Sequence, residues 1–345
     1  MLKPIKVLMT GAGAPGAPGI IKCLLQSSSI NLTVADADEN ATGKYLHHRF
    51  IQIPQTTQPH FAQTLLRICK EQKIDIVIPL VTKELAPLAH HKPAFEKEGI
   101  QILVSSAQAI AIANNKAACY NFLQQKNIAL PKFFVVNEVE EFLTAAKKLG
   151  FPEKEFCFKP SLSNGSRGFR IVSNKFDAAH LLFNFKPNNT YIGFDEAIKI
   201  LSAQSFPQLL VTEYLPGDEY SVDCLANNGQ MIIALPRLRT KMVNGISVQG
   251  KFVNDKTIID YCRQIIAAVG LHGNIGIQVK ISTEGELLLL EINPRVQGTI
   301  VAGLGAGVNL PLLAVKQELG LPITEFELEV EWNTGFRRYW TELFY

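Results

Sequence analysis

The chain has 345 residues, of which 47% are hydrophobic and 19% are charged. This composition excludes an intrinsically disordered chain, and the length favours two or three domains. Lys and Arg number 34 against 31 for Asp and Glu, without a basic run, so we expect no nucleic-acid partner. The sequence shows neither an apolar stretch of membrane-spanning length nor a signal peptide. We therefore expect a cytoplasmic protein that does not enter a membrane, with its six isolated cysteines reduced and buried.

The first third of the sequence alternates apolar strands with helical patterns. We expect strands at residues 5–10, 32–35, 50–53, 74–80 and 101–104, and helices at 19–26, 60–73 and 85–98. Nearly continuous apolar strands separated by helices are typical of a parallel sheet covered on both faces. Residues 1–113 are therefore predicted to form a doubly wound α/β domain.

The rest of the sequence predicts two α+β units. In residues 114–207 we expect helices at 114–126 and 138–149 and strands at 132–136, 156–158 and 169–172, followed by a mobile or weakly ordered connection at 184–207. In residues 208–345 we expect strands at 209–213, 220–226, 231–236, 274–281 and 287–292, helices at 256–269 and 310–319, and a packed terminal strand at 336–340. Turn sequences such as Glu284-Gly285 predict hairpins and a largely antiparallel sheet.

A glycine loop follows the first predicted strand. Gly11, Gly13 and Gly16 fit the pattern G-x-G-x-x-G, and Asp36 follows at the spacing of a dinucleotide-binding fingerprint. The loop also contains prolines, which lack the amide hydrogens that a pyrophosphate needs. No tyrosine has a lysine four residues later, as a short-chain dehydrogenase requires. We therefore favour a structural turn that lines a cleft, with an NAD-dependent oxidoreductase as the alternative.

Two later segments carry polar side chains at the ends of predicted strands. Lys159 ends a buried strand and precedes the Gly/Ser loop 161–168, whose backbone amides can close over phosphate oxygens. Further along, Glu213 and Glu219 flank a turn, where backbone groups at 213–215 suit an adenine edge and the Glu219 carboxylate suits ribose hydroxyls. An ordinary hairpin turn and two solvated acids are the respective alternatives.

A third segment predicts a metal site. Four leucines lead into Glu291 and Asn293, which share one face of a strand because they are two residues apart. Their oxygen atoms are the hard ligands that Mg²⁺ prefers. A two-residue loop at Glu284-Gly285 would set Thr283 opposite Glu286 and Gln278 opposite Glu291. A structural polar network is the alternative.

Taken together, these segments resemble the ATP-grasp enzymes, nearest to one synthetase unit of the carbamoyl-phosphate synthase large subunit. The resemblance covers nearly the whole chain and implies a pre-ATP-grasp domain at 1–113, then an ATP-grasp fold whose two α+β subdomains, 114–207 and 208–345, clamp the nucleotide. It implies an ATP site formed by Lys116, Lys159, Ser161, Gly165, Ser166, Gly168, Glu213, Tyr214, Leu215 and Glu219. It also implies that Gln278, Glu291 and Asn293 hold one or two Mg²⁺. Most of the family has an acid at the position of Gln278, whereas carbamoyl-phosphate-synthase-like members have glutamine, which puts the second metal in doubt.

The resemblance further implies phosphoryl transfer from ATP to a small-molecule carboxylate and attack on the acyl phosphate by an amine or ammonia. Arg295 would stabilise the phosphoryl group or bind the acceptor carboxylate. Arg239 and Arg237 are further candidates for phosphate or substrate, with a solvated edge strand as the alternative. Phosphorylation of bicarbonate or carbamate, and a nucleotide-binding module without turnover, remain alternative functions. We expect the acceptor where the loops 11–16, 82–84 and 297–299 meet, and the resemblance is compatible with a homodimer.

Overall fold

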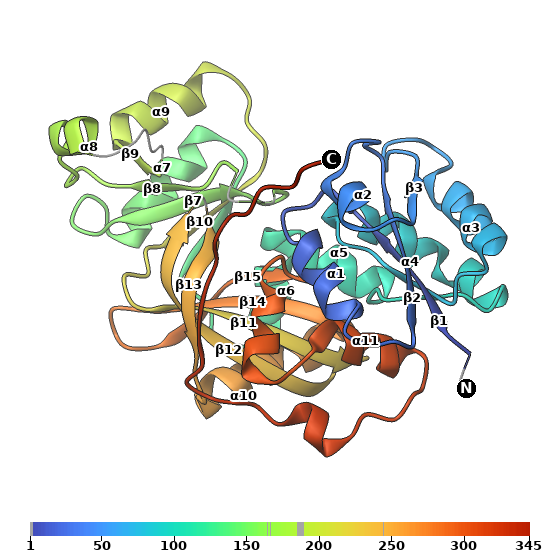
Figure 1. Ribbon diagram of the computed structural model, residues 1–345. Coiled ribbons are helices and arrows are strands. Elements are labelled where there is room, and N and C mark those ends of the chain that lie inside the picture. The colour runs from blue at the N-terminus through green and yellow to red at the C-terminus, as the bar shows by residue number, and fades with distance from the viewer. Residues whose placement is uncertain (1–2, 164, 166, 185–189, 244) are drawn as a thin grey trace. The chain divides into compact units, whose positions relative to one another are not determined.

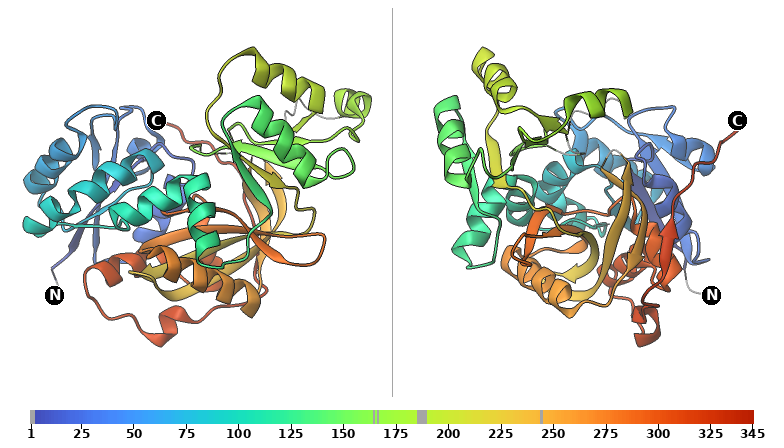
Figure 2. Two further views of the ribbon diagram at one scale, coloured as in Figure 1. Left: turned by 180° about the vertical axis from the view of Figure 1, so that it is seen from behind. Right: turned by 90° about the vertical axis from the view of Figure 1, so that its left-hand side faces the viewer.

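The computed structural model describes residues 3–163, 165, 167–184, 190–243 and 245–345 (Figures 1 and 2). By the proximity of Cα atoms the chain divides into two compact units. Unit 1 contains Met1–Asn114, Glu219–Gln278 and Glu291–Tyr345, and unit 2 contains Asn115–Asp218 and Val279–Leu290. The sequence predicts three domains, at 1–113, 114–207 and 208–345. This division into two units is coarser, so the three-domain boundaries stay a prediction.

Unit 1 begins with a five-stranded parallel sheet in the order β3-β2-β1-β4-β5. Its strands are β1 (Ile5–Thr10), β2 (Ile30–Asp36), β3 (Phe50–Gln52), β4 (Ile76–Ile78) and β5 (Gln101–Ile102). The helices are α1 (Ala17–Leu24), α2 (Thr42–Leu46), α3 (Phe61–Gln72), α4 (Thr82–Lys97) and α5 (Ala107–Asn114), and they cover both sheet faces (Figure 1). Val7 and Met9 pack into one core cluster and Leu8 into another, so both faces are buried and the predicted doubly wound domain is confirmed.

A second sheet, in the order β15-β14-β11-β12-β13-β16, follows later in the chain. Its strands are β11 (Glu219–Asn227), β12 (Gln230–Val243), β13 (Ile246–Phe252), β14 (Gly273–Ile281), β15 (Leu287–Asn293) and β16 (Gly335–Arg337). The helices are α10 (Lys256–Val269) and α11 (Leu310–Glu318), with 3-10 turns at Ile300–Ala306 and Glu325–Leu328. The recorded pairings of β11 with β12, β12 with β13 and β13 with β16 are antiparallel, as the turn sequences predict. Strands β14 and β15 each cross from one unit to the other.

Unit 2 holds a mixed sheet in the order β6-β10-β7-β8-β9. Its strands are β6 (Phe133–Val136), β7 (Phe156–Pro160), β8 (Arg170–Val172), β9 (Tyr191–Ile192) and β10 (Leu209–Glu213). Its helices are α6 (Lys116–Gln125), α7 (Val139–Leu149), α8 (Ala178–Asn184) and α9 (Phe194–Ala203). The core is formed by apolar side chains of α7, α9 and all five strands.

Two expectations about irregular segments are wrong. The mobile or weakly ordered connection expected at 184–207 contains β9 and α9 in its described part, and Ala197 and Leu201 of α9 are buried in the core of unit 2, whereas 185–189 lie outside the described residues. The polar residues of α9 are exposed and alternate with its buried apolar residues, so the sequence of this helix reads as polar and irregular. The terminal strand, expected to reach residue 340, ends at Arg337. Tyr339 and Trp340, which were expected to be packed, are 84% and 79% exposed.

Among the described residues, no single helix has the length and apolarity of a membrane span. Only the pair Ile300–Ala306 and Leu310–Glu318 reaches that length together, and this pair is bent by 102°.

Candidate active site

Two lysines of unit 2 lie near the loop that follows β7. Asn115 caps α6 by accepting a hydrogen bond from the amide of Ala118, so Lys116 is the first helical residue. Its Nζ donates to the carbonyl oxygen of Ser163 in the loop. Lys159, near the end of β7, donates from Nζ to the carbonyl oxygen of Leu290 at 2.7 Å.

The charges of both lysines affect the thiol of Cys119, which lies on α6. Burial raises the pKa of the Cys119 thiol to about 12, although the positive charges of Lys159 and Lys116 lower it. Both ammonium groups therefore act on one buried position of α6. Cys119, like the other five cysteines, is a free, buried thiol.

The Gly/Ser loop has features of an anion cradle. Ser161 is only 2% exposed, and among the described residues its hydroxyl has no hydrogen-bond partner. An orphaned buried hydroxyl fits an anionic ligand oxygen. Gly168 has a φ of +77°, and a Cβ there would meet Pro160 at 2.6 Å, so only glycine fits. Gly165 also has a positive φ, whereas Ser166 lies outside the described residues.

The hinge after β10 is held by side chains on both sides. The Glu213 carboxylate accepts a hydrogen bond from the amide of Lys132 at 2.6 Å, so this half-buried acid has a backbone partner. Lys280 places Nζ 5.2 Å from the ring centroid of Tyr214. Burial, followed by the neighbouring Tyr191, raises the pKa of Tyr214 to about 12. Leu215 is buried, which fixes the backbone that would face an adenine.

In unit 1, Glu219 and Arg239 form an ion pair across β11 and β12. Arg239 is 4% exposed and also donates from Nε to the hydroxyl of Ser247 at 2.8 Å. The alternatives of a solvated acid at 219 and a solvated edge strand are therefore wrong. Arg239 orients the Glu219 carboxylate in this structure.

Arg237, two residues earlier, is fully buried with Asp223. Its Nε and Nη2 lie 3.1 and 2.9 Å from Asp223 Oδ2, and Nη2 also donates to the hydroxyl of Thr299 at 2.8 Å. Burial raises the pKa of Asp223, and the charge of Arg237 opposes that effect. Within the described part of the chain, Asp223 Oδ1 and Arg237 Nη1 are buried without a partner. Arg237 thus anchors the segment that carries Thr299 instead of facing solvent.

The predicted metal ligands Glu291 and Asn293 share a face of β15, as their spacing predicts. Asn293 Nδ2 lies 3.1 Å from Glu291 Oε1. Across the described residues, no three His, Cys, Asp or Glu side chains gather as a metal site, so a zinc-type centre has no support there. One carboxylate with the amides of Asn293 and Gln278 fits Mg²⁺, which takes few protein ligands and completes its shell with water and phosphate oxygens. The Asn293 amide nitrogen faces Glu291 in this structure. For Glu291 and Asn293 to bind one metal ion through oxygen, the Asn293 amide has to flip.

The turn between β14 and β15 differs from the expected one. The amide of Ser282 donates to the carbonyl of Glu286 at 2.8 Å, and the amide of Gly285 donates to Ser282 at 3.2 Å. The loop therefore has three residues, 283–285, with Gly285 at a φ of +83°. The expected pairing of Thr283 with Glu286 is wrong, and the position of Gln278 opposite Glu291 no longer follows from the turn.

Arg295 follows β15 and is bound by uncharged oxygens. Its Nε lies 3.0 Å from Thr82 Oγ1 and its Nη1 lies 2.9 Å from the carbonyl of Val296. Burial lowers the pKa of Arg295, while the charge of Glu291 raises it. A half-buried guanidinium held by neutral groups is suited to an anionic ligand such as a carboxylate.

The glycine loop after β1 packs against the segment that follows Arg295. A Cβ at Gly16 would lie 2.3 Å from the Cα of Gly298, and Gly13 donates its amide to Asp36 at 2.7 Å. Gly298 thus covers the N-terminus of α1, where a dinucleotide would place its pyrophosphate. This contact disfavours the NAD alternative and explains the glycine at 16. With the bond from Arg295 to Thr82, it brings together the loops 11–16 and 297–299 and residues 82–84, which form the first turn of α4 and not the expected loop.

Sequence reasoning missed the roles of two side chains that support these groups. Glu84, at the start of α4, accepts a hydrogen bond from Thr10 at 2.6 Å, and its burial raises its pKa to about 7. Tyr120, one helical turn after Lys116, donates to the carbonyl of Leu289 at 2.6 Å. The four-residue spacing of Lys116 and Tyr120 was the one available signal.

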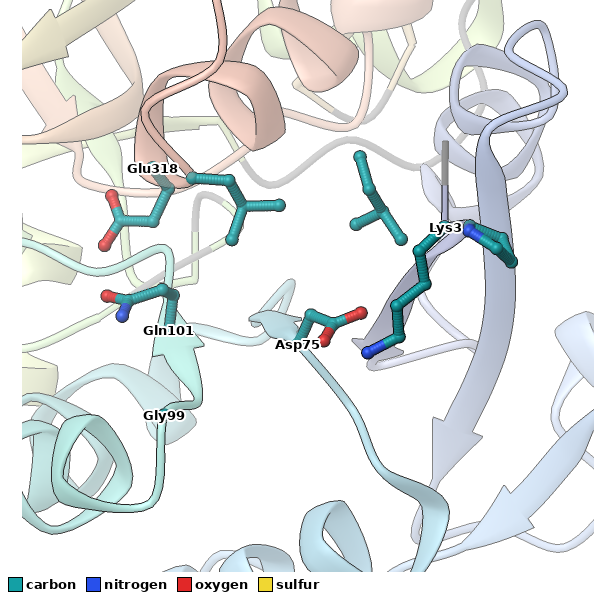
Figure 3. Close-up of a pocket in the computed structure, with 8 residues that line it drawn as sticks. Lys3, Asp75, Gly99, Gln101 and Glu318 are labelled. Atoms are coloured by element: carbon teal, nitrogen blue, oxygen red, sulfur yellow. The ribbon is translucent and has the colours of Figure 1, made fainter. Parts of the chain in front are cut away.

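A hollow of about 360 Å³ lies elsewhere in unit 1 (Figure 3). Its lining includes Lys3, Asp75 and Gln101, at the amino ends of β1, β4 and β5, and Glu318, at the end of α11. Thr82, Gly16 and Asp36 lie at the opposite, carboxyl ends of the sheet, where ligands bind in open α/β folds. The hollow is therefore separate from the candidate active site.

Comparison with known proteins agrees with this architecture. Residues 205–343 match the family described as "ATP-grasp in the biosynthetic pathway with Ter operon", and residues 7–103 match the PylC-like N-terminal domain. The carbamoyl phosphate synthase large chain of Clostridium perfringens (strain 13 / Type A) is 25% identical over 253 residues, which cover 70% of this chain and 22% of the relative. The match thus covers about a fifth of the length of this relative and of a second carbamoyl phosphate synthase large chain from the same species.

Two further proteins match over most of the chain. The formate-dependent phosphoribosylglycinamide formyltransferase of Ignicoccus hospitalis is 24% identical over 344 residues, covering 94% of this chain and 77% of the relative. The crystal structure of N5-carboxyaminoimidazole synthetase from Staphylococcus aureus complexed with ADP superposes with a TM-score of 0.70 at 18% identity, covering 96% of this chain and 81% of that one. The chain therefore has the fold of the ATP-grasp enzymes, with residues 205–343 matching the ATP-grasp family model and residues 7–103 the PylC-like N-terminal domain.

Proposed function

We propose that the chain is an ATP-dependent ligase that joins a carboxylate to an amine or ammonia through an acyl phosphate and releases ADP. The observation that carries this proposal is the 2.7 Å hydrogen bond from Lys159 Nζ to the carbonyl of Leu290, the residue before Glu291. A phosphate-binding lysine and a metal-binding carboxylate serve one phosphoryl transfer best when they are close neighbours.

On the nucleotide side, Lys116 and Lys159 neutralise phosphate charge. The loop with Ser161, Gly165, Ser166 and Gly168 closes over the phosphates and excludes water. Backbone groups of Glu213, Tyr214 and Leu215 bind the adenine, and Glu219 binds the ribose. Gln278, Glu291 and Asn293 would hold one or two Mg²⁺, which when bound offset the charge of the β- and γ-phosphates.

On the acceptor side, a carboxylate oxygen attacks the γ-phosphorus and ADP leaves. The amine or ammonia then attacks the carbonyl carbon, loses a proton and expels phosphate. Arg295 orients the carboxylate, because a guanidinium matches two oxygens at once. Arg239 remains a candidate for the transferring phosphoryl group, provided that it shares its charge with Glu219 during the reaction.

The test is ADP release from ATP in the presence of Mg²⁺, pooled amino acids and ammonium bicarbonate. Glu291→Ala is expected to abolish ADP release while the fold stays intact, and Lys159→Ala is expected to weaken nucleotide binding at least tenfold. Lys97→Ala, at an exposed end of α4, is the matched control and should change neither quantity. ADP release that persists in the Glu291 variant, or unchanged ATP affinity in the Lys159 variant, would refute these assignments.

The same assay separates the alternative functions. A nucleotide-binding module without turnover releases no ADP with any acceptor. ADP release that needs bicarbonate alone favours carbamoyl-phosphate-synthase-like chemistry, for which the glutamine at 278 is the supporting observation. We further propose Mg²⁺ as the metal, the reducing cytoplasm as the location, and a homodimer as the assembly.

A further inference from the structure

Tyr120 is buried between α6 and the strand that leads to Glu291. The side chain is 1% exposed, and its hydroxyl lies 2.6 Å from the carbonyl oxygen of Leu289 and 3.3 Å from that of Leu290. Lys159 Nζ binds the same Leu290 oxygen at 2.7 Å. One carbonyl therefore has two donors, one of them the lysine assigned to a phosphate.

The contact with two successive carbonyls reveals an irregularity in β15. In a regular strand, neighbouring carbonyls point to opposite edges, so one hydroxyl does not reach both. The burial pattern is irregular at the same place, since Leu288 and Leu289 are both buried and Leu290 and Glu291 are both half-buried. These two observations point to a β-bulge at 289–290, a device that re-aims the side chains after it.

The bulge also resolves the register of the two strands. Starting from the observed pair of Ser282 and Glu286, regular pairing sets Gln278 opposite Leu290. One extra residue in β15 between 286 and 291 returns Gln278 to the position opposite Glu291. On this inference the three-residue turn and the bulge offset each other, and Gln278 and Glu291 would face the same side.

We propose that Tyr120 is a positioning residue. Its hydroxyl closes the bulge that aims Glu291, and it keeps the Leu290 carbonyl satisfied when Lys159 transfers its ammonium to a nucleotide phosphate. The inference rests on the proposed function, because it takes the phosphate role of Lys159 from it. A buried carbonyl left without a donor is costly, so the second donor lowers the cost of releasing the lysine.

The test is a double-mutant cycle on ADP affinity, measured by calorimetry with EDTA so that no metal contributes. Tyr120→Phe is expected to weaken ADP binding about five- to tenfold in the wild-type background. In the Lys159→Ala background the same change is expected to have less than a twofold effect, because no ammonium leaves Leu290. Tyr261→Phe, at a buried tyrosine of α10, is the control and is expected to leave the affinity unchanged.

A second measurement addresses the bulge. Tyr120→Phe is expected to raise the Mg²⁺ concentration that half-saturates ADP binding about threefold, with or without Lys159, because the bulge acts on Glu291. A thermal melt checks that the variant folds. Should it not fold, Tyr120→His, which keeps a ring N–H donor, is measured in its place and is expected to retain ADP affinity within twofold, and a larger loss counts against the proposal.

Three outcomes overturn the inference. Equal losses of ADP affinity in both backgrounds make Tyr120 merely structural, and an unchanged Mg²⁺ requirement removes the bulge from the argument. If Lys159→Ala by itself leaves ADP affinity unchanged, the proposed function loses its phosphate lysine and the inference falls with it. The first two outcomes leave the proposed function standing.

Discussion

The Nζ of Lys159 lies 2.7 Å from the carbonyl oxygen of Leu290, and the next residue in the chain is Glu291. A strand of one sheet, β7, thereby contacts the end of a strand that belongs to another sheet. The acceptor, a backbone carbonyl, is uncharged. A charged phosphate binds an ammonium group more strongly, so it can draw the lysine away from the carbonyl. The lysine is thus kept beside Glu291, which we propose as a metal ligand.

Arg295 and Thr82 provide a direct test of the acceptor assignment. Arg295→Lys keeps a positive charge but loses the Nε bond to Thr82, so we expect acceptor-dependent ADP release to fall at least tenfold while ADP affinity stays within twofold. Thr82→Val removes only the oxygen partner and should cause a smaller loss in the same direction. The measurements are the kinetics of ADP release and calorimetry with ADP. Equal losses of nucleotide affinity would assign Arg295 to the ATP phosphates instead.

The architecture was predictable where the pattern of residues is local. The bounds of β1 and α10 follow from apolar periodicity, and Asp255 caps α10 from the preceding residue. Strand β13 and helix α9 were missed, because exposed polar side chains interrupt their apolar pattern. The tail beyond Arg337 was misjudged because its aromatic residues indicated burial that the fold does not provide.

The candidate site divides in the same way. Lys159, Glu291 and Asn293 stand out because each lies at the end of a strand with a recognisable sequence. Tyr120 contacts a carbonyl 169 positions away, and no periodicity encodes such a contact. The proposed bulge depends on backbone register and on the Tyr120 hydroxyl, which the local sequence of β15 specifies only weakly.

Gly16 is predicted to tolerate no side chain. Its Cβ would lie 2.3 Å from the backbone of Gly298, so Gly16→Ala must displace one of the two segments and should destabilise the protein by about 1–3 kcal/mol. Gly193→Ala is the control, since a Cβ there meets nothing within 4 Å. Urea unfolding measures both changes. A neutral effect at position 16 would show that the contact is loose.

Asp223 and Arg237 are predicted to depend on each other. Removing one partner leaves the other charge buried, so Asp223→Ala is expected to cost about 3–5 kcal/mol of unfolding free energy. Replacing both with apolar residues, Asp223→Leu with Arg237→Met, should cost less than the sum of the single changes. Additive losses in urea unfolding would contradict this coupling.

Glu84 is expected to make stability depend on pH. Its folded-state pKa of about 7 lies above the ordinary 4.5, because burial disfavours the charge. Between these values the folded protein keeps a proton that the unfolded chain has lost, so this contribution is complete below about pH 4.5 and is lost as the pH rises through 7. Glu84→Gln cannot ionise and still offers an oxygen to Thr10.

The variant should therefore match the wild type near pH 5 and exceed its unfolding free energy by about 1–3 kcal/mol at pH 8. Glu96→Gln, at an exposed position of the same helix, should show no such trend. Urea unfolding at pH 5, 6, 7 and 8 compares the three proteins. Parallel pH profiles for all of them would mean that Glu84 is ionised without cost in the fold, and that its bond to Thr10 offsets the burial.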